Sequence, residues 1–157
     1  MQIKIMQQQM AEKASAKLTI PTDIVSITDP DLPDAVFDET NPHVRRIFRM
    51  KFYDVDQESA QVPKATPADM EGLKEFIDTI APDTQLLIVH CRGGLSRSPG
   101  CAAAIAEYLG IKTQIWGSRK YVPNRHVYRT ATQILTGEKK DGEYFETMFS
   151  NIYDKHV

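Results

Sequence analysis

The segment with the clearest chemical potential is residues 90–98, His-Cys-Arg-Gly-Gly-Leu-Ser-Arg-Ser. A short apolar run, residues 86–89, precedes it, and a helical pattern from Ser98 to Leu109 follows it. A glycine-containing loop between a strand and a helix N-terminus gathers backbone N–H groups around one point, where the helix dipole adds positive potential. Arg97 can bind two phosphate oxygens at once through its planar guanidinium group. The segment therefore predicts a binding site for a tetrahedral phosphate.

Cys91 lies at the mouth of this loop, and the same positive potential would stabilise its thiolate, which is the nucleophilic form. The loop amides, Arg97 and the hydroxyl of Ser98 would supply that stabilisation. A thiolate that faces a bound phosphoryl group predicts phosphoryl transfer through a covalent phosphocysteine. An isolated cysteine would more simply be a buried inert thiol, but the surrounding loop favours the catalytic interpretation over that one.

The elements that must position this loop alternate along the chain, which predicts an α/β fold. We expect one domain over residues 1–157, with a central, mostly parallel sheet flanked by helices and the phosphate-binding loop between a central strand and a buried helix. The expected strands are Ile3–Met6, Ile24–Ile27, Val44–Val55 and 86–89. The expected helices are Gln7–Lys17, 67–81, Ser98–Leu109, Val127–Leu135 and Gly142–Tyr153, with a loop at 29–43.

His-Cys, five residues, then Arg-Ser resembles the signature of the cysteine-dependent protein tyrosine phosphatase superfamily. The ending 94–98 resembles the dual-specificity branch, particularly its compact bacterial and phage-type members. The resemblance implies that Cys91 is the nucleophile, that Arg97 binds the phosphoryl group, that Ser98 stabilises the leaving thiolate and that His90 supports Cys91 from behind. It also implies that the substrate-binding cradle is made by Arg92, Gly93, Gly94, Leu95, Ser96 and Arg97.

A weaker match lies at Arg119–Asn124, which resembles the segment ending in Pro-Asn before the last helices of dual-specificity phosphatases. Lys120 stands there where that family usually has proline. Asn124 itself is interpreted as a helix cap or a loop brace rather than a substrate ligand.

The family protonates its leaving group with an aspartate on a loop that precedes the cysteine. Parallel strands end at the same edge of a sheet, so Asp54 and Asp56, after the strand near 47–53, should lie at the edge where Cys91 lies. Asp83 precedes its strand and should fall at the opposite edge, and Asp69 is better explained as a helix cap. We favour Asp54 over Asp56 because Asp54 directly follows the end of the strand.

The predicted activity is phosphomonoester hydrolysis. The predicted substrate is a phosphorylated protein, with phosphotyrosine first and phosphoserine or phosphothreonine second, or a small phosphoester. Two alternatives stay open at this point. Rhodanese-type sulfurtransferases also begin an anion-binding loop with cysteine, although their loops generally hold one residue fewer before the arginine. A non-catalytic phosphate-binding module is the other, and the intact Cys91–Arg97 pair argues against it.

Composition excludes several other classes. The formal net charge of −2 lacks the basic surplus typical of nucleic-acid-binding proteins, and no apolar run is long enough to span a membrane. Two cysteines are too few for a disulfide framework, and the scattered histidines have no metal-ligand spacing, so we expect no metal and no cofactor. We expect a cytoplasmic protein, with Cys101 packed in the core and with surface positions for His43, His126 and His156.

Overall fold

Four parallel strands form the sheet of the computed structural model, which describes residues 1–138. The strands are β1 (Gln2–Gln7), β2 (Thr22–Thr28), β3 (Val44–Lys51) and β4 (Leu86–Cys91), in the spatial order β1-β4-β2-β3. The helices are α1 (Gln8–Ser15), α2 (Pro67–Asp78), α3 (Arg97–Leu109) and α4 (Arg125–Thr136). All three strand pairings are parallel, so the loops that follow β2, β3 and β4 leave the sheet at the same end.

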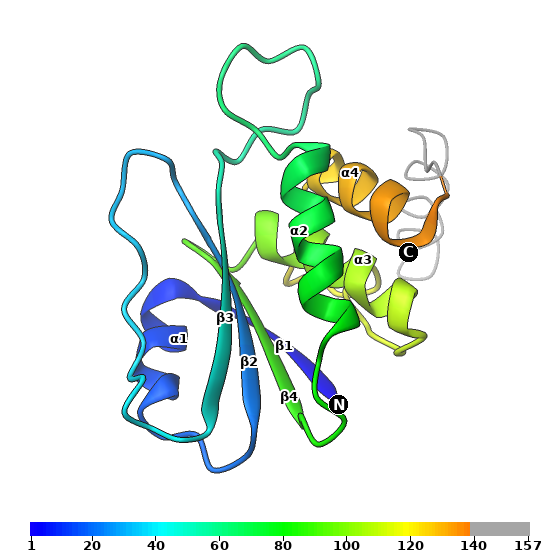
Figure 1. Ribbon diagram of the computed structural model, residues 1–157. Helices are drawn as coiled ribbons and strands as arrows, with labels where there is room; N and C mark the ends of the chain where they lie inside the picture. Colours follow the sequence, from blue (N-terminus) through cyan, green and yellow to red (C-terminus); the bar gives the residue numbers. More distant parts are fainter. Residues whose placement is uncertain (139–157) are drawn as a thin grey trace.

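The sheet is covered on both faces (Figure 1). Helices α2, α3 and α4 pack on one face, and α1 with the loop 29–43 covers the other. Strand β4 lies between β1 and β2 and is buried along its whole length, because alternate side chains enter the two opposite cores. The continuous apolar run 86–89 therefore has the central position that its sequence predicted.

Helix α3 lies in the middle of the larger core, with every residue from Arg97 to Ala106 buried. Small side chains from Cys101 to Ala104 allow this close packing, and Gly110 ends the helix in the left-handed conformation with φ 69°. Helix α2 begins with the capping box of Thr66 and Asp69, which confirms the interpretation of Asp69 as a helix cap.

Several predicted boundaries were wrong by a few residues. The strand expected at Val44–Val55 ends at Lys51, because β2 ends at Thr28 and offers its last carbonyl to Phe52 N–H. Four helix predictions change at one or both ends: Gln7–Lys17 becomes Gln8–Ser15, 67–81 becomes Pro67–Asp78, Ser98–Leu109 becomes Arg97–Leu109, and Val127–Leu135 becomes Arg125–Thr136. The other three strands are longer than predicted, at Gln2–Gln7, Thr22–Thr28 and Leu86–Cys91. The helix predicted at Gly142–Tyr153 lies outside the described residues.

The predicted surface position of His126 was wrong. His126 is buried in the first turn of α4, and its Nε2 lies 2.8 Å from the carbonyl oxygen of Ala65. His43 is half-buried beside Asn41, and His156 lies outside the described residues. A single polar residue on an amphipathic helix gives no sequence signal for such a tertiary contact.

The described residues thus form a single α/β domain, with a parallel sheet flanked by four helices, as the sequence predicted. Within this part of the chain, none of the helices has the length and apolar character that crossing a membrane requires.

Candidate active site

The nucleophile candidate stands at the junction between the central strand and the buried helix. Cys91 is the last residue of β4, Arg97 is the first of α3, and residues 92–96 form the loop between them. The Sγ atom of Cys91 lies 3.1 Å from Ser98 Oγ and 3.5 Å from the backbone nitrogen of Ser98. Two donors at the N-terminus of α3 thus face the thiol sulfur, and each would stabilise a thiolate.

Glycine is required in the loop at Gly94, which has φ 67°. A Cβ atom at this position would lie 2.8 Å from the nitrogen of Gln7 and 2.8 Å from the carbonyl carbon of Met6. The loop therefore packs its backbone directly on the backbone at the end of β1. A second close approach occurs in α3, where a Cβ atom on Gly100 would lie 2.6 Å from the carbonyl oxygen of Asn124.

Arg97 is held by two contacts that sequence reasoning did not find. Its Nη1 donates to Asp29 Oδ1 at 2.6 Å and to the carbonyl oxygen of Phe52 at 2.8 Å. Both bonds use Nη1, and among the described residues no hydrogen bond engages Nε or Nη2, the edge that a bidentate phosphate contact requires. The arrangement orients the guanidinium group while leaving this edge for two anionic oxygens.

Asp29 was interpreted from the sequence only as part of a turn with Pro30. It directly follows β2, so it leaves the sheet at the same end as Cys91. The topological argument that selected Asp54 and Asp56 would also have selected Asp29, had the strand Ile24–Ile27 been included in it.

His90 lies beneath the loop, fully buried, and contacts residues of the sheet interior. Its Nε2 lies 2.6 Å from Ser26 Oγ, and its Nδ1 lies 3.2 Å from the carbonyl oxygen of Cys91. Burial lowers the pKa of His90 below its usual value, and the backbone hydrogen bond to Cys91 opposes this effect. The ring is therefore neutral, with Nδ1–H donating to the carbonyl and Nε2 accepting from the Ser26 hydroxyl. This geometry links His90 to the backbone of Cys91.

The two candidate acids have different neighbours. Asp54 Oδ1 accepts hydrogen bonds from Ser96 Oγ at 2.8 Å and from Asn124 Nδ2 at 2.7 Å, so this carboxylate reaches the phosphate loop itself. Asp56 instead accepts from the backbone nitrogen of Arg125 at 2.6 Å and from its Nε at 3.1 Å. Asp56 is thus engaged at the first residue of α4, whereas Asp54 is the candidate that contacts the phosphate loop.

Asn124 joins three parts of the site. Its side chain caps α4 by accepting from Val127 N–H at 2.9 Å, and it also donates to Asp54. Its backbone nitrogen donates to the carbonyl oxygen of Ser96 at 2.9 Å. Asn124 is therefore both the helix cap and the loop brace that the sequence predicted, and it holds the acid against the phosphate loop.

The remaining residues of the predicted site divide by exposure. Arg92, Gly93 and Leu95 are exposed. Cys101 is fully buried, and burial raises the pKa of its thiol to about 12, which fits the core-packing interpretation.

Within residues 1–138, no group of three or more histidine, cysteine, aspartate or glutamate side chains has an arrangement that could hold a metal ion.

Comparison of the sequence with protein-family models gives no match. Comparison with curated proteins gives none either. Among solved structures, the human tyrosine phosphatase-like serine/threonine/tyrosine-interacting protein aligns with a TM-score of 0.51 and 17% identity, over 98% of this chain and 92% of that one. The chain shares the tyrosine phosphatase-like fold.

Two further structures align at lower TM-scores. Human DUSP28 gives 0.47 with 13% identity, over 98% of this chain and 92% of that one. The Yvh1 phosphatase domain from Chaetomium thermophilum gives 0.45 with 15% identity, over 98% and 89%. At these identities the comparisons concern the fold alone.

Proposed function

We propose that this protein is a phosphomonoester hydrolase of the protein tyrosine and dual-specificity phosphatase type. Cys91 is the nucleophile, Arg97 binds the phosphoryl group, Asp54 is the general acid, and Ser98 and His90 support the cysteine. The backbone N–H groups of residues 92–97 form the cradle for the phosphoryl oxygens. The two donors of Ser98 at the sulfur of Cys91 are the observation that carries the proposal.

The reaction has two steps. The thiolate of Cys91 attacks phosphorus, an S–P bond forms, the P–O bond to the leaving group breaks, and Asp54 donates its proton to the leaving oxygen. Asp54 then removes a proton from water, which attacks the phosphocysteine, and the S–P bond breaks to release phosphate and the thiolate. The Ser98 hydroxyl donates to the sulfur as negative charge returns to it.

The substrate class is a phosphorylated protein, with phosphotyrosine foremost and phosphoserine or phosphothreonine also accepted, or a small phosphoester. The Gly94–Ser98 ending supports the dual-specificity branch, and the compact bacterial or phage type rests on that ending alone. Both cysteines are free thiols, and a catalytic thiolate suits a reducing compartment such as the cytoplasm.

Hydrolysis of an aryl phosphate, without added metal and with vanadate as competitor, tests the proposal. We expect wild type and Cys101→Ala to hydrolyse the ester, vanadate to inhibit both, and Cys91→Ser to be inactive although folded by circular dichroism. Cys101→Ala is the matched control because it removes the other thiol. Equal activity of wild type and Cys91→Ser would refute the phosphocysteine mechanism. Transfer of sulfur from thiosulfate to cyanide without phosphatase activity would instead indicate a rhodanese.

A further inference from the structure

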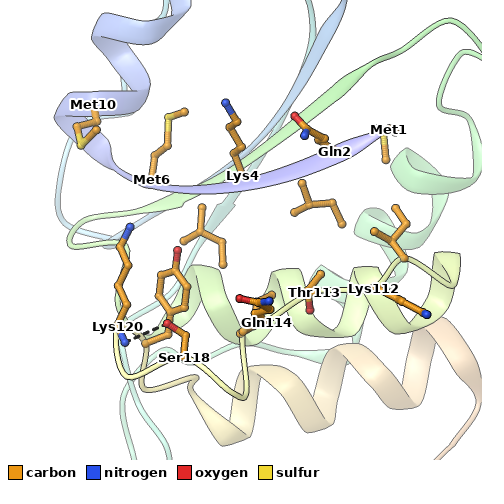
Figure 2. A pocket seen from close by; sticks show the side chains of 15 residues that line it. Met1, Gln2, Lys4, Met6, Met10, Lys112, Thr113, Gln114, Ser118 and Lys120 are labelled. Atoms are coloured by element: carbon orange, nitrogen blue, oxygen red, sulfur yellow. Dashed lines mark hydrogen bonds between the residues drawn. The ribbon is translucent and has the colours of Figure 1, made fainter.

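A groove of about 670 Å³ runs along the outer side of β1 (Figure 2). Its opposite wall is the loop between α3 and α4, residues 111–121. Its volume is typical of sites that bury a ligand rather than of surface irregularities. None of the predicted site residues lines it, so it is separate from the phosphate loop described above.

The wall formed by β1 is an open sheet edge. Gln2 N–H donates to the carbonyl oxygen of Gln85 and Gln8 N–H to that of Arg92, so the even-numbered residues of β1 bond β4. Because N–H and C=O of one residue point to the same side in a parallel ladder, the groups of Ile3 and Ile5 point away from β4, toward the groove. No hydrogen bond to these groups is present among the described residues. An edge of this kind is a template for another extended chain.

Three lysines stand around the rim of the groove. Lys120 projects from the opposite wall toward β1, Lys4 projects from the side of β1 that faces away from that wall, and Lys112 lies at the far end of the wall with its amine pointing outward (Figure 2). All three are exposed, and within residues 1–138 none forms an ion pair, whereas no aspartate or glutamate is among the lining residues. The protein as a whole has a net charge of −2, so this concentration of lysines is local and complements an acidic ligand.

One end of the groove adjoins the phosphate loop through both of its walls. Met6, which lines the groove, packs its backbone against Gly94. On the other wall, Val122 N–H donates to the carbonyl oxygen of Leu95, directly after the groove residue Tyr121. Gln7 pairs with Cys91 in the sheet register, and Ile3 lies four residues before Gln7, about 13 Å along the strand. The groove therefore begins beside the end of β1 that pairs with Cys91 and continues along the strand for about four extended residues.

We infer that this groove binds the acidic, extended peptide segment that flanks the phosphorylated residue of a protein substrate. The segment pairs its backbone with Ile3 and Ile5 as an added strand, and its carboxylates lie near the rim lysines Lys4, Lys112 and Lys120. The inference rests on the proposed function and assigns it a substrate preference: acidic residues about three to six positions from the phosphorylated residue, on one side only. A single-stranded nucleic acid would match the lysines but would leave the edge N–H groups without a strand partner.

Steady-state kinetics on phosphotyrosine peptides test this preference. We expect kcat/KM for a peptide with four acidic residues on the favoured side to exceed that of its glutamine-substituted form about tenfold, and acids on the other side to give no gain. Lys112→Glu/Lys120→Glu should abolish the gain and leave kcat/KM for an aryl phosphate within twofold of wild type. Lys13→Glu/Lys17→Glu, at exposed positions in α1 and two residues after its end, changes the net charge equally and should preserve the gain.

Direct binding separates this inference from the proposed function. The unphosphorylated acidic peptide, carrying a fluorophore, is titrated with wild-type protein and followed by anisotropy. N-methylation of alternate peptide amides should weaken binding in one alternate set and spare the other, because only every second N–H faces β1. Equal weakening by both sets, equal binding to both double variants, or competition by a single-stranded oligonucleotide as strong as by the peptide would overturn the inference. If wild type binds the peptide in this manner but does not hydrolyse aryl phosphate, the proposed function fails and the groove stands.

Discussion

Replacing Gly94 with alanine tests whether the phosphate loop depends on close packing against β1. Gly94 has φ 67°, and a Cβ atom there would lie 2.8 to 3.0 Å from backbone atoms of Met6 and Gln7. Gly110 has almost the same φ, 69°, but a Cβ atom there meets nothing within 4 Å. The pair therefore separates the cost of overlap from the cost of the left-handed backbone conformation.

The expected magnitudes follow from these two situations. A left-handed alanine costs about 1 kcal/mol in either variant. At Gly94 the overlapping atoms belong to the backbone of β1, so relief requires the strand end or the loop to move, which adds roughly 1–3 kcal/mol. We therefore expect Gly94→Ala to lower the free energy of unfolding by about 2–4 kcal/mol and Gly110→Ala by about 1 kcal/mol.

Urea denaturation measures the loss of stability in each variant, and the slope m of the unfolding free energy against urea concentration should be the same as in wild type. Hydrolysis of an aryl phosphate measures the effect on activity, because displacement of the loop would move the phosphate-binding N–H groups away from Cys91. We expect kcat/KM to fall by more than about tenfold in Gly94→Ala and to stay near wild type in Gly110→Ala. Equal stability losses together with equal activities in the two variants would show that the packing of the loop on β1 does not matter, and would refute the reasoning.

Three further predictions concern the site. Asp54→Asn should lower kcat on an alkyl phosphate by about a hundredfold, since that leaving group needs a proton, whereas Asp56→Asn should stay within a few-fold of wild type; the reverse ranking would assign the acid to Asp56. Asp29→Ala should weaken vanadate binding about tenfold because Arg97 loses one of its two anchors, and unchanged or tighter inhibition would contradict that role. Between pH 7 and 5 the free energy of unfolding should fall, by at most about 1.4 kcal/mol per pH unit, because the lowered pKa leaves folded His90 less protonated than the histidine of the unfolded chain, which takes up a proton near its usual value of 6.5. His90→Gln should flatten this dependence in urea titrations, and an unaltered slope would exclude His90 as its source.

Local patterns predicted the elements of this fold because burial, capping and periodicity act over a few residues. The apolar run 86–89 has its central place in the sheet, Asp69 caps α2, and Gly110 ends α3. The C-terminal end of β3 was less predictable, since the alternating pattern continues past Lys51, but Phe52 N–H donates to the last carbonyl of β2 and the residues after it have no strand partner there. The length of an edge strand depends on how far its neighbour in the sheet continues, so the end of β3 cannot be predicted from its own residues alone.

For the candidate site, the sequence by itself determined the loop and predicted its chemistry. Cys91, the glycines, Arg97 and Ser98 lie within eight consecutive residues, so their geometry follows from one strand, one turn and one helix N-terminus. Parallel connectivity also determined which end of the sheet carries the aspartates, which is why Asp54 could be proposed before any coordinates were known.

Only the tertiary structure decided which distant groups meet the loop. Asp29 reaches Arg97 across 68 residues, Ser26 reaches His90 across 64, and Asn124 reaches Asp54 across 70. The groove between β1 and residues 111–121 also forms only when the chain is folded. Contacts over such separations depend on strand order and on how the helices pack on the sheet. Neither of these produces a periodic pattern in the sequence from which the contacts could be predicted.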